Sequence, residues 1–152
     1  MSDRLHIRKA GKTDVPSILA LLADDDLQKL KPSGVTPQHL STFDRIDGDS
    51  NQFLAVAELD GKTVGCLQLT FIPGLSREGM DRCLIEGVRI ARHLRGKNLG
   101  TQMVEWAIAA CRERGCGLVQ LLMDRRRLDA QRFYKSLGFE ANHQGFRLYL
   151  RE

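Results

Sequence analysis

The sequence lacks the patterns of a metal-binding, secreted or membrane-spanning protein. Its four cysteines include no C-x-x-C pair, and its four histidines show no spacing suited to zinc. No apolar run approaches the roughly 20 residues that a membrane helix needs, and the first residues lack the apolar stretch of a signal peptide. We therefore expect a cytoplasmic protein without a metal site, whose cysteines are buried thiols rather than disulfides.

Length and composition are those of an ordinary globular domain. The chain has 152 residues, of which 42% are hydrophobic and 28% are charged, and a chain of this size buries roughly 70% of its unfolded surface. Neither repeats nor linkers interrupt it, so we predict a single domain over residues 1–152. The net charge of +4 fits an anionic partner, but the excess is too small to indicate nucleic-acid binding.

Hydrophobic periodicity predicts a mixed sheet with flanking helices, α+β in class with α/β-like crossovers. Asp60-Gly61 indicates a hairpin turn. Thr13 and Asp129 are candidate helix N-caps, whereas residues 76–82 read as a loop. We expect strands at residues 5–9, 53–59, 64–72, 83–90 and 118–123, a terminal hairpin turning at Gln144-Gly145, and helices over residues 14–23, 37–47, 99–115 and 130–138.

A short basic turn stands between the expected strand at residues 83–90 and the helix that follows it. The first N–H groups of a helix lack internal partners, and the helix dipole favours negative charge there. Arg95 and Lys97 add full positive charges to this turn, so it predicts a phosphate or pyrophosphate site. It is not a Walker loop, because Gly96-Lys97 is followed by Asn98, and the G-x-G-x-x-G dinucleotide pattern is absent.

Two motifs resemble those of the GNAT acyltransferase superfamily. Arg95-x-x-Asn98-x-Gly100 resembles the Arg/Gln-x-x-Gly-x-Gly/Ala signature that holds the pyrophosphate of acetyl-CoA. Asn98 stands where the family usually has Gly, and Asn is the residue that next best tolerates a left-handed backbone. Residues 129–139 resemble the downstream A-x-x-F-Y-x-x-x-G-F motif. The chain is therefore identified as a small, bacterial-type, single-domain member of this superfamily.

The resemblance implies a fold and a cosubstrate. The fold would be the GNAT fold, with a mixed, largely antiparallel central sheet, and the cosubstrate would be acetyl-CoA. The backbone of Val88 and Ile90 would pair with the pantetheine arm as an added strand would, and one of their N–H groups could polarise the thioester carbonyl. The residues implied for the CoA phosphates are Arg95, Gly96, Lys97, Asn98, Leu99, Gly100 and Thr101, with Arg127 as a further contact.

Glu86 and Tyr134 are the candidate catalytic residues. An alkylamine with a pKa of roughly 10.4 arrives protonated, and Glu86 could remove that proton directly or through water. We expect partial burial in the strand to raise the pKa of Glu86 towards a useful range. Tyr134 could protonate the departing thiolate. Alternatively, Glu86 is a strand residue paired with Arg89 or Arg82, and Tyr134 is a packed aromatic; Phe133 is expected in the core.

The expected function is direct acetyl transfer to a primary amine, without an acyl-enzyme. The alternative is a catalytically inactive, acyl-CoA-binding sensor or regulatory protein of the same fold. The run Arg125-Arg126-Arg127 is either a solvated loop or a phosphate contact; binding of DNA through it would require a steep salt dependence. The acceptor is a small-molecule or peptide amine, and Asp24-Asp25-Asp26 slightly favour a cationic one. Whether the protein forms a homodimer stays open.

Overall fold

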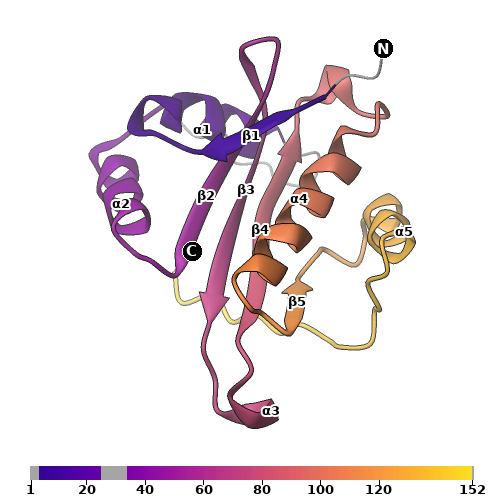
Figure 1. Cartoon of the computed structure of the whole chain (residues 1–152). Helices are drawn as coiled ribbons and strands as arrows, with labels where there is room; N and C mark the ends of the chain where they lie inside the picture. Colours follow the sequence, from indigo (N-terminus) through magenta and orange to yellow (C-terminus); the bar gives the residue numbers. More distant parts are fainter. Residues whose placement is uncertain (1–3, 25–33, 152) are drawn as a thin grey trace. The chain divides into compact units, whose positions relative to one another are not determined.

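The computed structural model describes residues 4–24 and 34–151, in two compact units that divide after Gln120 and are described separately. No helix within the described ranges is long and apolar enough to cross a membrane. The elements, labelled in Figure 1, are β1 (His6–Lys9), α1 (Val15–Ala23), α2 (Pro37–Asp47), β2 (Gln52–Leu59), β3 (Lys62–Ile72), α3 (Ser76–Gly79), β4 (Arg82–Ile90), α4 (Leu99–Glu113), β5 (Leu118–Leu121) and α5 (Leu128–Ser136), with short 3₁₀ helices at Lys12–Asp14 and Arg92–Leu94.

The sheet has five strands in the order β1-β2-β3-β4-β5, and the pairings β1–β2, β2–β3 and β3–β4 are antiparallel. The turn between β2 and β3 lies at Asp60-Gly61 as predicted, and both residues have a positive φ. The α+β class and the largely antiparallel sheet are thus confirmed. The loop expected at residues 76–82 contains the four-residue element α3, in which Arg77 and Glu78 have left-handed backbones.

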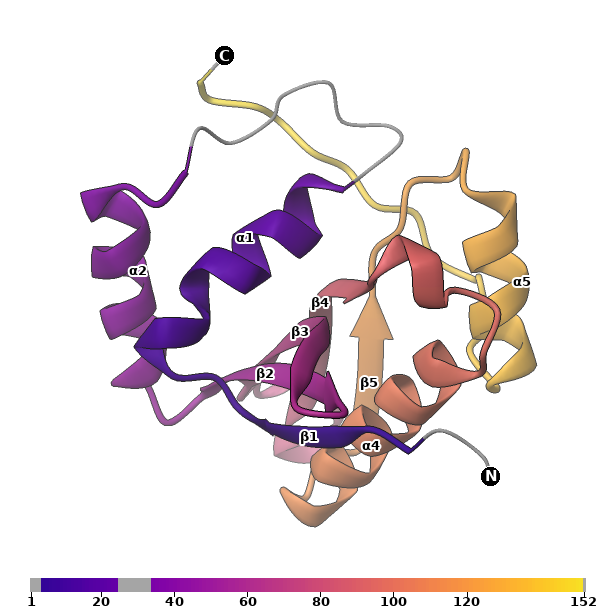
Figure 2. The same ribbon diagram turned by 90° about the horizontal axis from the view of Figure 1, so that it is seen from above.

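Helices cover both faces of this sheet. Figure 2 shows α1 and α2 on one face and α4 on the other. Successive residues of a strand point to opposite faces, and β3 shows this directly. Cys66 packs into a buried cluster with Val15 and Ile18 of α1 and Phe43 of α2. The preceding residue, Gly65, faces α4, where a Cβ atom would approach the Met103 sulfur.

The N-cap of α1 is one residue further along the chain than the predicted cap, Thr13. Thr13 lies inside the 3₁₀ helix Lys12–Asp14, and Asp14 is the N-cap of α1. Asp14 is 8% exposed. Its carboxylate accepts two hydrogen bonds from the Arg8 guanidinium and one from the Gly11 N–H. Arg8 also donates to Glu58 on β2. Asp14 thus joins β1 to the start of α1, a long-range role that cap rules based on sequence alone do not contain.

Replacing Asp14 with Asn should make the protein less stable at neutral pH and less sensitive to acid. The hydrogen bonds from Arg8 hold the pKa of Asp14 below its ordinary value of 3.8. A lowered pKa stabilises the fold above that ordinary value, and this stabilisation disappears as the pH falls through the lowered one. Urea unfolding should show a loss of about 2 kcal/mol at pH 7 that shrinks towards pH 2.

Asp44→Asn is the matched control for this experiment. The carboxylate of Asp44 pairs with Lys12, but both side chains are more than half exposed, and exposed pairs contribute little to stability. An equal loss of unfolding free energy in the two variants would contradict the role assigned to Asp14.

The second unit carries α5 and an extended C-terminal segment. The N-cap of α5 is Arg127, so Asp129 lies in the first turn and does not cap the helix as predicted. Phe133 is half-buried rather than a core residue, and its ring contacts Tyr134 edge-on. The hairpin predicted at Gln144-Gly145 is wrong, because the structure assigns no strand to residues 139–151. The side chains of this segment that should have formed its apolar face are exposed: Phe146, Leu148 and Leu150.

Candidate active site

The strand β4 carries a β-bulge at the point where the candidate base and the expected pantetheine contacts meet. Cys66 pairs with Arg89 and Gln68 pairs with Glu86, so Gly87 and Val88 together stand opposite a single residue of β3. Gly87 has a φ of +63°, the left-handed conformation that such a bulge requires and that glycine adopts without strain. The bulge takes the backbone of Val88 out of the β3 ladder.

The neighbours of the bulge hold it in place from one face. The Cys66 thiol donates a hydrogen bond of 3.5 Å to the Gly87 carbonyl. A Cβ atom on Gly87 would lie 3.5 Å from Leu22 of α1, so this helix contacts the bulge. Burial raises the pKa of the Cys66 thiol to about 12, so this thiol is a weak donor and not a nucleophile. None of the four cysteines forms a disulfide.

Glu86 lies at the start of the bulge and is exposed. The partial burial expected for it is therefore wrong. Among the residues that the structure describes, neither Arg82 nor Arg89 forms an ion pair with Glu86, so the alternative of a salt-bridged strand residue gains no support. An exposed carboxylate beside the bulge can exchange protons with an amine or with a water molecule.

The basic turn before α4 has the geometry of an anion-binding site. Asn98 is the N-cap of α4 and adopts the left-handed conformation, with φ 67° and ψ 12°, as its tolerance for this region predicts. Its side chain makes no capping hydrogen bond, so the first-turn N–H groups of the helix remain available to a bound anion. Arg95, Gly96 and Lys97 are exposed next to them.

The other residues expected to bind CoA differ in whether they can offer a side chain or only their backbone. The Leu99 side chain is 1% exposed and packs with Val64 and Leu94, so Leu99 can offer only its backbone. Gly100 and Thr101 complete the first turn of α4 and are half-buried, as are Val88 and Ile90 on β4. Glu86, the bulge and the basic turn all belong to the first unit: Glu86 and the bulge lie on β4, and the basic turn follows β4 along the chain.

Tyr134 and Arg127 belong to the second unit. Tyr134 is half-buried on α5 and stacks edge-on against Phe133 and Phe139, with ring centroids 5.1 and 5.6 Å apart. Within the basic run, the Arg126 guanidinium is bound to Asp124, whose pKa it lowers. Arg126 is thus engaged within its own loop, which partly supports the interpretation of the run as a solvated loop.

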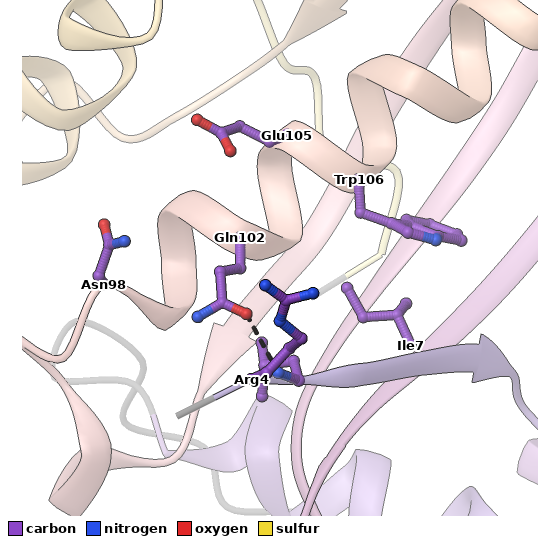
Figure 3. A pocket seen from close by; sticks show the side chains of 7 residues that line it. Arg4, Ile7, Asn98, Gln102, Glu105 and Trp106 are labelled. Carbon is purple, nitrogen blue, oxygen red and sulfur yellow. Dashed lines mark hydrogen bonds between the residues drawn. The ribbon is translucent and has the colours of Figure 1, made fainter. Parts of the chain in front are cut away.

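A pocket of about 510 Å³ lies between α4 and the start of β1 (Figure 3). Gln102 spans it and accepts a hydrogen bond from the Leu5 N–H, while Arg4, Glu105 and Trp106 line its rim. This pocket lies on the α4 side of the sheet, whereas Glu86 shares the opposite face with Gln68. It is therefore distinct from the candidate reaction site, although Asn98 of the basic turn is one of the residues that line it.

The sequence of residues 18–139 matches the Acetyltransferase (GNAT) family. This match covers most of the chain and runs through both units, and it includes the β4 bulge, the basic turn and α5. The protein therefore belongs to the GNAT acetyltransferase family, whose acyl donors are acyl-CoA thioesters.

The chain is also similar to individual proteins of known sequence or structure. An aminoalkylphosphonate N-acetyltransferase from Salmonella typhimurium is 36% identical over 98 residues, which make up 64% of this chain and only 63% of that protein. The crystal structure of a transcriptional regulator from Bacillus halodurans C-125 is 40% identical with a TM-score of 0.89, covering 97% of this chain and 100% of that one. A Trypanosoma brucei acetyltransferase is 27% identical with a TM-score of 0.79, covering 97% and 100%.

Proposed function

We propose that this protein is an acetyl-CoA-dependent N-acetyltransferase that acts on a primary amine. The observation that carries the proposal is the basic turn at the start of α4, with Asn98 left-handed and the first-turn N–H groups uncapped. Family membership supplies the class of donor. The bulge in β4 supports the assignment, because it removes Val88, two residues from the exposed Glu86, from the pairing with β3.

The proposed reaction is a direct transfer. The amine nitrogen attacks the thioester carbonyl carbon while Glu86, directly or through water, takes one N–H proton. An N–H group of the bulged strand at Val88 or Ile90 stabilises the negative charge on the carbonyl oxygen. The carbon–sulfur bond then breaks, and Tyr134 gives its proton to the CoA thiolate. The products are the N-acetylated amine and CoA, and the protons lost and gained by the protein balance through solvent.

The phosphates of the donor are assigned to residues of the basic turn. The pyrophosphate would lie against the N–H groups of Leu99, Gly100 and Thr101, with the side chains of Arg95 and Lys97 beside it. Gly96 and Asn98 shape the turn through their left-handed backbones. Arg127 at the N-cap of α5 is proposed as a further phosphate contact.

Aminoalkylphosphonates are the first acceptors to test, because the Salmonella relative is named for them. A cationic acceptor has less support than the acidic run suggested. Asp24 is hydrogen-bonded to Arg92, whereas Asp25 and Asp26 lie outside the described residues. We further propose that both units form one domain in a cytoplasmic protein.

A regulatory role is the second candidate function. The 40%-identical Bacillus halodurans protein is a transcriptional regulator, which favours the alternative of a protein that binds acyl-CoA without catalysis. Acetyl-CoA binding without acetylation of any amine in a panel of aminoalkylphosphonates, aminoglycosides, polyamines and amino acids would support this role. Turnover of any of these amines would support the enzyme.

Calorimetric titration with acetyl-CoA, 3′-dephospho-CoA and ATP tests the phosphate site. We expect selective micromolar binding of acetyl-CoA, and a dissociation constant at least ~10-fold higher in the Arg95→Ala/Lys97→Ala double variant, because charge-assisted bonds to phosphate are lost. Lys62→Ala is the control, since Lys62 is an exposed cation at the β2–β3 hairpin. Equal affinity for acetyl-CoA in both variants would contradict the assignment.

A further inference from the structure

A row of polar side chains crosses the sheet on the face that carries Glu86. Gln52 of β2 pairs with Thr70 of β3, and Gln68 of β3 pairs with Glu86 of β4. Cys66, Gln68 and Thr70 follow one another at intervals of two residues, so all three point to the face that α1 and α2 partly cover. On this face of the sheet, polar side chains therefore lie next to the apolar cluster that contains Cys66.

Hydrogen bonds within this row fix the orientation of Gln68. The Gln52 side-chain oxygen accepts from Gln68 Nε2 at 2.8 Å and from Thr70 Oγ1 at 3.0 Å. An amide oxygen has two lone pairs, so these donors saturate it. The strand β3 lies between β2 and β4 (Figure 1). The amide nitrogen of Gln68 is thus bound on the β2 side, and its amide oxygen takes no part in these bonds.

Gln68 and Glu86 are directly opposed in the β3–β4 pairing. Side chains of directly opposed residues in an antiparallel pair lie within contact distance of each other. The Gln68 amide oxygen and the Glu86 carboxylate can both accept hydrogen bonds, and neither is bound to a donor within the part of the chain that the structure describes. Two neighbouring acceptors fit a ligand group that carries at least two hydrogens on one atom.

We propose that Gln68 determines acceptor specificity: its amide oxygen binds one N–H of a primary amine while Glu86 takes the proton from the same nitrogen. This inference rests on the proposed function. The ammonium ion first loses one proton to solvent. The neutral primary amine then has two N–H bonds during attack, one whose proton Glu86 takes and one that Gln68 holds. A neutral secondary amine has a single N–H, and a hydroxyl has a single hydrogen, so neither satisfies both oxygens.

The test compares a primary amine with its N-methyl derivative. The first pair is 2-aminoethylphosphonate and its N-methyl form; if the protein does not acetylate 2-aminoethylphosphonate, the amine of the panel that reacts fastest takes its place. Gln68→Met keeps the length of the side chain and removes the acceptor. We expect the KM for the primary amine to rise about 10-fold and the preference for it over the N-methyl form to fall by a similar factor, because a bond to a charged or reacting group is lost. The KM for acetyl-CoA should stay unchanged.

Two further variants separate this role from a purely structural one. Thr70→Val removes the other donor to Gln52, so it perturbs the same row but should leave the amine preference intact. Gln68→Glu restores an acceptor and should restore the preference, while its charge raises the pKa of the opposed Glu86 and moves the pH–rate profile to higher pH.

The outcomes distinguish the inference from the function on which it rests. Equal loss of preference in Gln68→Met and Thr70→Val, or an unchanged preference in Gln68→Met, would overturn the role of Gln68 in a working enzyme. A wild-type protein that binds acetyl-CoA and acetylates no amine would instead refute the proposed function.

Discussion

Glu86→Gln should lower kcat by about 100-fold, the lower end of what a positioned general base contributes. Glutamine preserves the size and hydrogen-bonding capacity of the side chain but cannot accept a proton. The loss should shrink as the pH rises towards about 10, because solution then supplies the amine already neutral. The KM for acetyl-CoA should not change, since Glu86 is not part of the turn at Arg95–Thr101. Release of the CoA thiol, followed across pH, measures all three quantities.

Glu105→Gln provides the matched control for this loss. Glu105 is an exposed carboxylate on α4, which covers the opposite face of the sheet (Figure 3). The same chemical change there should leave kcat unaffected. A normal rate in Glu86→Gln at pH 7 would remove Glu86 from the mechanism, and a constant ratio to wild type across pH would show that it does not act as the base.

Gly65→Val should cost roughly 3 kcal/mol of unfolding free energy and lower the melting temperature by about 10 °C. A Cβ atom at Gly65 would lie 2.7 Å from the Met103 sulfur, 3.0 Å from the Arg89 carbonyl oxygen and 3.0 Å from Ile90 Cδ1. Met103 is fully buried, and a strand carbonyl cannot turn aside, so α4 must move away from the sheet. Thermal and urea unfolding measure the loss.

Gly117→Ala separates close packing from the general effect of replacing a glycine. The three atoms nearest to a Cβ there all belong to the Met80 side chain, the closest at 2.7 Å. Met80 is 36% exposed and has three rotatable bonds with which to withdraw. We therefore expect a change below about 1 kcal/mol. A loss in Gly65→Val no larger than in Gly117→Ala would show that the contact between α4 and the sheet tolerates an added side chain.

The sequence predicted those features that short stretches encode. The helix at residues 99–115 is one example, because its apolar face, its start after Asn98 and its end at Gly115 are all local. The β2–β3 hairpin is another, since Asp60-Gly61 supplies both left-handed residues. The phosphate-binding turn could be proposed for the same reason, because an anion site at a helix N-terminus needs few residues.

Features that depend on distant partners could not be predicted in this way. Alternating apolar residues at 146–150 indicated a strand, but an extended segment becomes a strand only where another edge accepts its hydrogen bonds. Thr13 was predicted to cap the first helix, but Asp14 is the N-cap, and its carboxylate binds Arg8 on β1. Gln68 gave no signal in the sequence, because its role depends on Gln52 and Glu86 on the neighbouring strands. A glycine inside a strand, as at Gly87, was the available sign of the bulge.

The identity of residue 98 has a consequence for the thermodynamics of donor binding. A glycine at this position of the turn would sample many backbone conformations in the unliganded protein, and binding would have to restrict them all. Asn98 has fewer conformations to lose and already stands at φ 67°. The turn is therefore preorganised, so a smaller loss of conformational entropy should oppose binding of the pyrophosphate that we propose for it.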